Sequence, residues 1–344
     1  MSQKNEFENI WKRTMKPHRV AIDACSICQL QCTGCYMRKS SHLADIGEGW
    51  LSASNFEKFL NNAPYVSSVE LSNNGEPFLN PELGEIFLIA SKHNVHITIG
   101  GGANFNRVDS RVLELIVKTG VRILTIALDG ASQKTYAMYR RGGDFDNVIE
   151  NIRLLNFYKE KFNSEWPKLN WQFVLMQHNQ YEVLKAKELA SQLQMKISFK
   201  LSWEPGFHAE NPKQLTELTG LDCFSREAYM EKKHIPYRME SCLQLFTRPA
   251  INWDGRLLGC TNNWRQAYDV NVFKVGLEEA LQNCLYQSAK YRLMGNAEDE
   301  QNDFPCCYCP YHYFEIRKKT GKFLTSEDIV KDLNHWEGIE RLNW

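Results

Sequence analysis

Short apolar runs alternate with longer amphipathic segments between residues 20 and 201. Apolar and β-branched residues predict strands at 20–24, 66–71, 95–99, 121–128, 171–176 and 196–201. Apolar positions at helical spacing predict helices at 54–60, 81–93, 110–119, 132–140, 145–161 and 181–193. Ser54 is the expected cap of the first helix, and Pro81 is expected to open the second. The pattern is a strand–helix unit repeated about six times.

Strands that alternate with helices of this length predict an α/β fold with a parallel sheet, and chemistry is then expected on loops beyond the carboxyl ends of the strands. The periodicity fades after residue 202, where the stretch SWEPGFHAENP indicates a linker and substrate loop. We therefore predict an N-terminal extension, an α/β region, this linker, a small cysteine-bearing domain and a polar helical tail, at residues 1–18, 19–202, 203–241, 242–320 and 321–344.

Composition and charge narrow the function classes. Forty-one basic residues balance forty-one acidic ones among 344 residues, so no net charge draws the chain to nucleic acid or to an anionic membrane. Apolar runs such as 121–128 are far shorter than the roughly 20 residues of a membrane-spanning helix. The N-terminus lacks the apolar segment of a secretion signal, which predicts a cytoplasmic protein in which disulfides are rare. Eleven cysteines therefore indicate metal binding.

The first four cysteines stand within eleven residues, directly after the first predicted strand. Cys28, Cys32 and Cys35 have the spacing CxxxCxxC. Three thiolates on one loop can hold three irons of a 4Fe–4S cluster and leave the fourth iron open to a small molecule. The alternative is a zinc ion held by these thiolates and Cys25, although the spacer between the two CxxC pairs is much shorter than in zinc ribbons. Cys25 is otherwise expected to be a buried thiol.

These motifs resemble those of the radical S-adenosylmethionine (SAM) superfamily. The segment CQLQCTGCY at 28–36 is similar to its cluster motif, and NGEP at 74–77 resembles its GGEP motif. The segments LDG at 128–130 and YRRGG at 139–143 resemble the SAM-contacting strand end and the loop that follows it. The resemblance covers about residues 20–202. It implies a partial (β/α)6 TIM-like barrel with a 4Fe–4S cluster, whose open iron is chelated by the amino and carboxylate groups of SAM.

The resemblance also implies individual SAM contacts. The glycine of NGEP lets the backbone approach the SAM amine, the glutamate accepts its charge, and an arginine of YRRGG can pair with the SAM carboxylate. Gly34 replaces an aromatic residue that is usual in the family, so Tyr36 is the expected adenine contact. Glycines 100–102 precede Asn104, which is the candidate ribose contact. The predicted SAM-binding residues are Tyr36, Asn74, Gly75, Glu76, Pro77, Asn104, Asp129, Arg140 and Arg141, with either arginine as the carboxylate partner.

A second cysteine set lies towards the C-terminus. Two of its cysteines flank the hairpin-turn signal NWDG at 252–255, and two later ones form CxxC. Four thiolates in this arrangement make a closed site for a second 4Fe–4S cluster or for a structural zinc ion. The segment 242–312 resembles the Twitch or shortened SPASM domain of many radical SAM enzymes, which implies one auxiliary cluster. The predicted ligands are Cys242, Cys260, Cys306 and Cys309; Cys307 is a less regular substitute for Cys306, and Cys223 and Cys284 are expected to be buried thiols.

The resemblance implies that the first cluster reduces SAM to methionine and a 5′-deoxyadenosyl radical, which abstracts hydrogen from a substrate. An auxiliary cluster without an open iron would accept an electron from the substrate radical, which predicts an oxidation. The proton lost in such a reaction requires a base. The candidates are Glu204 and His208 on the loop after the sixth strand, and Asp254 in the hairpin turn.

The predicted substrate is a small hydroxylated molecule, such as an aminocyclitol or a sugar. Flavodoxin or ferredoxin is the expected electron donor, and no nucleic-acid or membrane partner is expected. The alternative is a ribosomally made peptide, as for SPASM maturases, although only about 19 residues precede the first predicted strand and leave little room for a leader-binding module. A non-catalytic iron–sulfur or zinc protein is the third hypothesis, which would not explain the SAM-motif residues at the strand ends.

Overall fold

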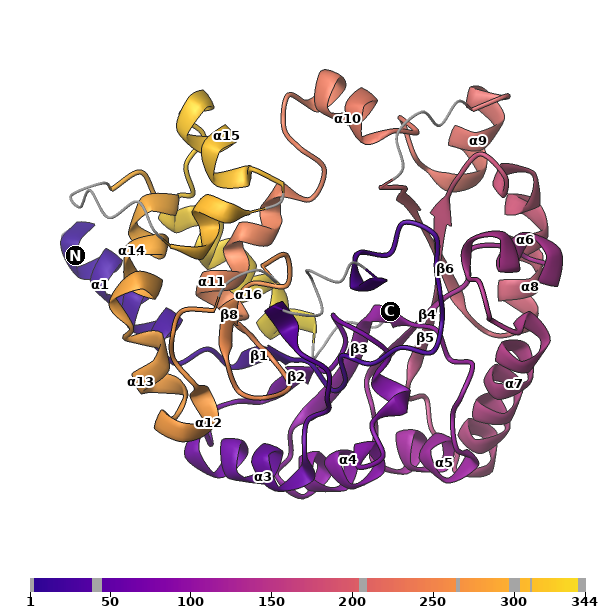
Figure 1. The fold of residues 1–344 in the computed structure, drawn as a ribbon, viewed down its shortest axis with the longest axis horizontal. Coiled ribbons are helices and arrows are strands. Elements are labelled where there is room, and N and C mark those ends of the chain that lie inside the picture. The colour runs from indigo at the N-terminus through magenta and orange to yellow at the C-terminus, as the bar shows by residue number, and fades with distance from the viewer. Residues whose placement is uncertain are drawn as a thin grey trace.

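Eight strands form one curved sheet in the order β6–β5–β4–β3–β2–β1–β7–β8, in a computed structural model that describes residues 3–38, 45–203, 209–263, 267–296, 304–309 and 311–339 (Figure 1). The neighbouring pairs from β1 to β6 are all parallel. These six strands are β1 (Arg19–Ile22), β2 (Ser68–Glu70), β3 (His96–Ala103), β4 (Ile123–Ala127), β5 (Lys168–Leu175) and β6 (Lys196–Leu201). The predicted partial (β/α)6 barrel is thereby confirmed.

Helices cover the outer, convex face of this sheet (Figure 1). They are α3 (Ala53–Asn62), α4 (Leu83–Lys92), α5 (Ser110–Lys118), α6 (Gln133–Tyr139), α7 (Phe145–Lys161) and α8 (Val183–Gln192). The prediction that Ser54 caps α3 is wrong: Ser52 has extended backbone ahead of the helix, and its side chain accepts the Asn55 N–H. Pro81 does not open α4 either, because a 3-10 turn, η2 (Pro77–Leu79), comes first and α4 begins two residues after the proline.

The cysteine-bearing C-terminal segment continues the same sheet. Strand β7 (Ala250–Ile251) pairs in parallel with β1, and β8 (Leu257–Gly259) pairs with β7 in the antiparallel sense. The predicted NWDG turn joins these two strands, with Gly255 at a φ of +93°. Four short helices follow or precede the hairpin: α11 (Gln244–Thr247), α12 (Val272–Val275), α13 (Leu277–Leu281) and α14 (Cys284–Leu293). One buried hydrophobic cluster runs from the barrel into this segment.

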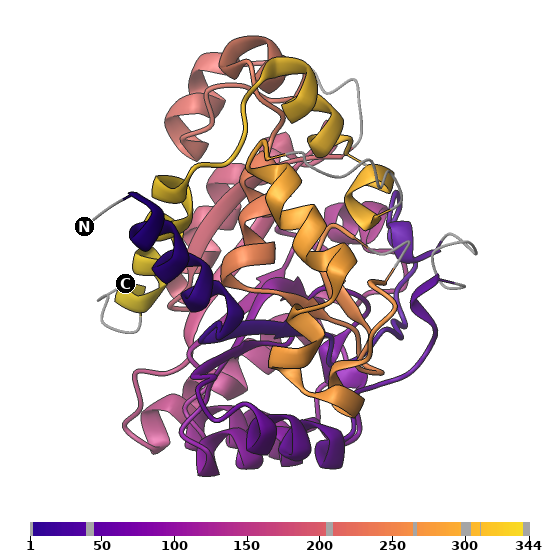
Figure 2. The same cartoon turned by 90° about the vertical axis from the view of Figure 1, so that its left-hand side faces the viewer.

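Helices also form at the chain's two ends and in the predicted linker. Near the ends, α1 (Gln3–Met15) and α16 (Ser326–Ile339) lie side by side and both contact α11 (Figure 2). The linker contains α9 (Pro212–Thr219) and α10 (Arg226–Lys233) and leads to a 3-10 turn, η4 (Met239–Leu243). A second such turn, η5 (Pro305–Tyr308), precedes α15 (Tyr313–Thr320). Within the described ranges, no helix is long and apolar enough to cross a membrane.

Candidate functional site

The cysteines of the CxxxCxxC motif lie together on the loop that follows β1. Cys32 is buried, and Cys28 and Cys35 are partly buried. Burial raises the pKa of the Cys28 thiol to about 12, and negative charge on Glu76, Cys32 and Cys35 adds to this increase. The three thiols are therefore close enough to influence one another, and a metal that binds them must displace their protons.

Backbone hydrogen bonds join this loop to the other motif-bearing loops. The Gln31 N–H donates to the Arg141 carbonyl over 2.8 Å, and the Glu76 N–H donates to the Ile27 carbonyl over 2.8 Å. The parallel strands place all these loops at one edge of the sheet. The fold thus brings the CxxxCxxC, NGEP and YRRGG motifs together.

Cys25 lies apart from these three thiols. It is fully buried, its thiol donates to the Ile27 carbonyl at 3.7 Å, and its backbone forms an isolated bridge with Trp50. Burial raises its pKa to about 11, and the charges that add to this increase are those of Glu76 and Asp23 rather than of another cysteine. This arrangement favours a three-thiolate site over a four-cysteine zinc site.

The NGEP motif packs directly beneath the cysteine loop. Gly75 has a φ of +64°, and a Cβ there would lie 2.4 Å from the Cys25 carbonyl oxygen, so only glycine permits this approach. The Asn74 side-chain amide donates to Asp23 over 2.7 Å. Its Oδ1 is buried and has no hydrogen-bond partner among the described residues. A buried acceptor in this position suits the ammonium group of a ligand.

Glu76 is buried at the same place, and Pro77 begins the turn η2 that follows it. The Glu76 carboxylate accepts the Asn104 N–H over 2.6 Å and the Phe78 N–H over 3.4 Å. Burial raises its pKa to about 7, against the opposite effect of these hydrogen bonds and of Arg140. A cationic partner would restore the charged form, as expected for a carboxylate that binds an ammonium group.

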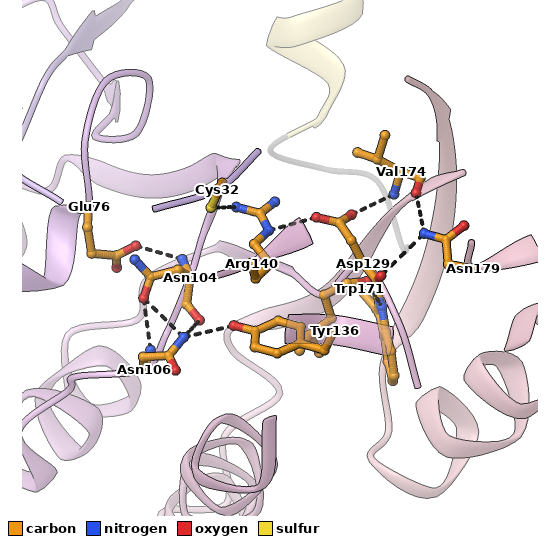
Figure 3. A network of polar contacts seen from close by, with 11 residues as sticks. Cys32, Glu76, Asn104, Asn106, Asp129, Tyr136, Arg140, Trp171, Val174 and Asn179 are labelled. Atoms are coloured by element: carbon orange, nitrogen blue, oxygen red, sulfur yellow. Dashed lines mark hydrogen bonds and ion pairs between the residues drawn. The ribbon is translucent and has the colours of Figure 1, made fainter. Parts of the chain in front are cut away.

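An ion pair next to the cysteine loop joins Arg140, which directly follows α6, to Asp129, beyond the end of β4 (Figure 3). The Asp129 side chain is fully buried, with Oδ2 2.7 Å from Arg140 Nε and Oδ1 accepting the Val174 N–H over 2.8 Å. Arg140 Nη1 lies 3.7 Å from Cys32 Sγ. Burial alone would lower the pKa of Arg140, but Asp129 and Cys32 raise it well above its usual value. Within the described ranges no residue hydrogen-bonds to Nη2, which leaves that nitrogen for a ligand carboxylate.

The remaining predicted SAM contacts fall into two groups. Arg141 has an exposed side chain, so Arg140 rather than Arg141 lies against the thiol loop. Asn104 is 3% exposed, and its amide nitrogen lies 3.5 Å from Cys28 Sγ. The Tyr36 hydroxyl donates to the Asn73 carbonyl at 3.5 Å. Asn104 and Tyr36 are thus placed next to the cysteine loop.

The four predicted ligands of the second set line one small, mainly apolar cavity. Cys242 lies in η4, Cys260 follows β8, and Cys306 and Cys309 lie in and directly after η5. Burial raises the pKa of Cys260 to about 12, and Cys309 and Cys242 contribute to the increase. Neither Cys307 nor Cys223 lines this cavity, and Cys284 is exposed at the start of α14 rather than buried as predicted.

The two metal hypotheses require different spacings of the thiols. Zinc holds its sulfur ligands about 2.3 Å from a single ion. In the part of the chain that the structure describes, no group of three or more Cys, His, Asp or Glu side chains is arranged to hold a metal ion. A 4Fe–4S cluster binds each thiolate at a different iron and therefore needs thiols that are farther apart. A 4Fe–4S cluster or a structural zinc ion on the second set therefore stays a prediction.

A cavity of about 440 Å³ lies between the two cysteine sets. Tyr36 and Asn73, which adjoin the CxxxCxxC and NGEP motifs, form part of its wall. Ser241 and Thr261, which are the sequence neighbours of Cys242 and Cys260, form another part. A molecule in this cavity would therefore lie between the two candidate cluster sites.

The candidate bases have different outcomes. Glu204 and His208 lie outside the described residues. Asp254 does not line the cavity, because its carboxylate pairs with Arg256 Nε at 2.7 Å within the hairpin turn. The structure adds titratable cavity residues that the sequence did not single out, among them Glu70 at the end of β2 and Lys200 in β6. Their positions near the carboxyl ends of predicted strands were the available signal for these two.

Comparison with known proteins supports the resemblance to the radical SAM superfamily. Residues 24–159 match the family model described as Radical SAM superfamily. A stretch of 183 residues is 21% identical to the AdoMet-dependent heme synthase of Methanosarcina barkeri, covering 52% of this chain and 49% of that protein. The chain thus spans about half the length of this relative.

Two solved structures illustrate the likeness of fold. Streptococcus suis SuiB bound to S-adenosylmethionine aligns over 90% of this chain and 75% of its own, with 14% identity and a TM-score of 0.61. BtrN in complex with AdoMet and 2-DOIA aligns over 79% of this chain and 84% of its own, with 12% identity and a TM-score of 0.42. The likeness to SuiB is one of fold.

Proposed function

Because residues 24–159 form a radical SAM domain, we propose that this chain is an oxidoreductase that removes hydrogen from a small hydroxylated molecule. The observation that carries the proposal is the cavity of about 440 Å³ between the two cysteine sets. Its volume lies within the range of small-ligand sites. A substrate there can contact groups next to both sets at once.

The described residues fit the cofactors that the superfamily uses, a 4Fe–4S cluster and SAM. In this proposal Cys28, Cys32 and Cys35 hold the first cluster. Glu76 and the Asn74 Oδ1 accept the SAM ammonium, and Arg140 Nη2 binds the SAM carboxylate. When bound, these groups supply hydrogen-atom abstraction, and a second cluster on the later cysteine set supplies a site for the electron that the substrate loses.

The chain's own residues then have three tasks. Cavity residues hold the reacting carbon of the substrate towards the first cysteine loop, and the walls keep water away from it. A base takes the proton of the substrate hydroxyl. In sum the substrate loses one hydrogen atom, one proton and one electron, and its carbinol becomes a carbonyl. Glu204 and His208 remain the proposed bases, and flavodoxin or ferredoxin in the cytoplasm remains the proposed electron donor.

A peptide substrate is the second candidate. One solved structure with the same fold shows SuiB bound to its precursor peptide SuiA, aligned over 90% of this chain with a TM-score of 0.61. The cavity has the size of a small molecule and favours the first candidate, so the peptide is kept as the alternative that substrate tests should include.

Iron content and SAM cleavage test the proposal. Anaerobically reconstituted protein should bind about eight irons and release 5′-deoxyadenosine with a reductant. Replacing all three cysteines of the first set with alanine should abolish this release, and replacing all four of the second set should leave about four irons. The control is Cys284→Ala, which removes an exposed thiol outside both sets and should change neither value.

Two results would contradict the proposal. SAM cleavage by a variant without the first set would refute the superfamily chemistry. One zinc with about four irons in the unaltered chain would refute the second cluster.

A further inference from the structure

The cavity between the two cysteine sets has an excess of positive charge. A single carboxylate, that of Glu70, lines it among the described residues. The basic residues in its wall come from five separate segments of the chain: Arg19, Lys200, Arg226, Arg238 and Arg248. Four of these side chains are half-buried and Arg238 is exposed. Charges that have lost part of their hydration favour a ligand of the opposite charge.

The single negative charge of Glu70 offsets only part of this positive charge. Its carboxylate accepts the Ser72 N–H at 3.1 Å, the Ser72 hydroxyl at 2.5 Å, the Thr98 hydroxyl at 2.6 Å and the Gly100 N–H at 2.8 Å. All four donors belong to the barrel wall, and no ion pair joins Glu70 to a basic side chain in the described part of the structure. The negative charge is therefore already held by local hydrogen bonds.

Arg226 also has partners within the protein. Its Nε donates to the Ser202 carbonyl over 2.9 Å. Its guanidinium lies 3.1 Å from the centre of the Trp203 ring and 4.7 Å from that of Tyr237. These contacts stabilise the wall of the cavity, so we do not assign Arg226 to the ligand.

Of the other four cations, Arg238, Arg248 and Lys200 have capacity left for a ligand. The guanidinium groups of Arg238 and Arg248 make no hydrogen bond or ion pair with any described residue. Lys200 donates to the Gln172 side chain, which uses one of its three N–H groups. Burial lowers the pKa of Arg248, although Glu70 and Asp332 act in the opposite direction. Burial together with Arg238 lowers the pKa of Lys200 to about 8, although Asp129 and Glu70 act in the opposite direction. A bound anion would stabilise the charged forms of both Lys200 and Arg248.

We propose that the substrate carries a carboxylate or a phosphate, which Arg238, Arg248 and Lys200 bind. This inference rests on the proposed function and restricts its substrate to acidic hydroxylated molecules, such as sugar acids or sugar phosphates. A guanidinium can donate to two oxygens of either group at once, which makes arginine the preferred partner. The ammonium group of an aminocyclitol would instead meet three cations and be repelled.

Sugars that share one hexose ring and differ in charge provide the test. Glucuronate, glucose 6-phosphate, glucose and glucosamine are titrated into the reconstituted protein with SAM, without reductant, and binding is followed by calorimetry. At least one acid should bind about tenfold more tightly than glucose and glucosamine, because charge-assisted hydrogen bonds are added. The comparison of the two acids distinguishes a carboxylate from a phosphate substrate.

Variants locate the anion. Arg238→Met, at an exposed position of the wall, and Arg248→Met, at a half-buried one, should each weaken binding of the acid about tenfold and leave the affinity for glucose unchanged. The control is Arg111→Met, which removes an exposed arginine on the outer helix α5. Its affinity for the acid should equal that of the unaltered protein.

Equal affinity for all four sugars, or no binding of either acid at millimolar concentration, would overturn the proposal. Tighter binding of a tetraglutamate peptide than of either acid would overturn the small-molecule assignment. Because these titrations need no SAM cleavage, either failure can be told apart from failure of the proposed function, which the release of 5′-deoxyadenosine reports separately.

Discussion

Replacing Arg140 with methionine should weaken SAM binding and destabilise the fold, and the two effects can be separated. Arg140→Met removes the charged group proposed to bind the SAM carboxylate. A charge-assisted hydrogen bond contributes about 1.5–3 kcal/mol, so the Kd for SAM should rise about 10- to 150-fold. Calorimetric titration of SAM into the reconstituted protein measures this change.

The same substitution leaves Asp129 without its ion-pair partner. The Asp129 side chain is fully buried, and among the described residues only the Val174 N–H then still donates to its carboxylate. Breaking a buried ion pair from one side costs about 3–5 kcal/mol. Since the Arg140 side chain is 16% exposed, we expect a value near 3 kcal/mol, measured by urea denaturation of the protein without cofactors.

A double variant distinguishes binding from folding. Asp129→Asn combined with Arg140→Met removes the unpaired charge but keeps an acceptor for the Val174 N–H, so most of the stability should return while SAM binding stays weak. Arg141→Met is the matched control, since its side chain is exposed, and should change the free energy of unfolding by less than about 0.5 kcal/mol. Recovery of SAM affinity in the double variant would refute a direct role of Arg140, and weak binding in Arg141→Met would transfer that role to its neighbour.

Two further substitutions probe backbone fit and a buried charge. Gly75→Ala should lower the iron content and reduce the free energy of unfolding by about 2 kcal/mol, because the added Cβ would collide with the Cys25 carbonyl. The control is Gly120→Ala, also at positive φ but with no atom within 4 Å of the added Cβ, which should reduce the free energy of unfolding by about 1 kcal/mol and keep the iron. Lys290 in α14 is fully buried and donates to the Thr14 hydroxyl over 2.6 Å, and burial lowers its pKa from 10.5 to about 7. The unfolded chain therefore binds more protons than the folded one between pH 7 and 10.5, so the free energy of unfolding should rise with pH in this window. Lys290→Met should abolish that rise and increase the free energy of unfolding by about 2–4 kcal/mol at pH 7. An equal increase at pH 9 would contradict this explanation.

Local sequence patterns predicted the repeated elements well. The helix at 145–161 and the strand at 196–201 have the predicted bounds. The helix begins where the Asp144 side chain accepts the Asn147 N–H, a local signal that needs no tertiary contact. Ser52 and Ser54 show the limit of prediction from local sequence, because both residue types suit a helix cap. The backbone is extended at Ser52, and this makes Ser52 the cap.

The charge of the cavity could not be predicted in this way. The basic residues that we assign to the substrate, Lys200, Arg238 and Arg248, are separated by other elements along the chain and share no spacing. The balance of 41 basic and 41 acidic residues predicted only that the chain as a whole has no net charge to attract nucleic acid or a membrane. Net charge describes the whole surface, whereas a site depends on which few charges the fold leaves unpaired. The sequence also could not show that Arg140 is buried against the thiol loop and that Arg141 is exposed, because neighbouring residues in a loop can point in opposite directions.

The shared sheet determines how variants of the second cysteine set must be interpreted. The Ala21 N–H donates to the Pro249 carbonyl and the Asp23 N–H to the Ile251 carbonyl, each over 3.0 Å, so β7 is fixed to the strand that leads into the first cysteine loop. A metal site that stabilises the hairpin therefore also supports that loop. Loss of product in a variant of the second set indicates a missing electron acceptor only if the variant still binds SAM with unaltered affinity. Weaker SAM binding would instead show that the strand pairing has transmitted a structural change from one site to the other.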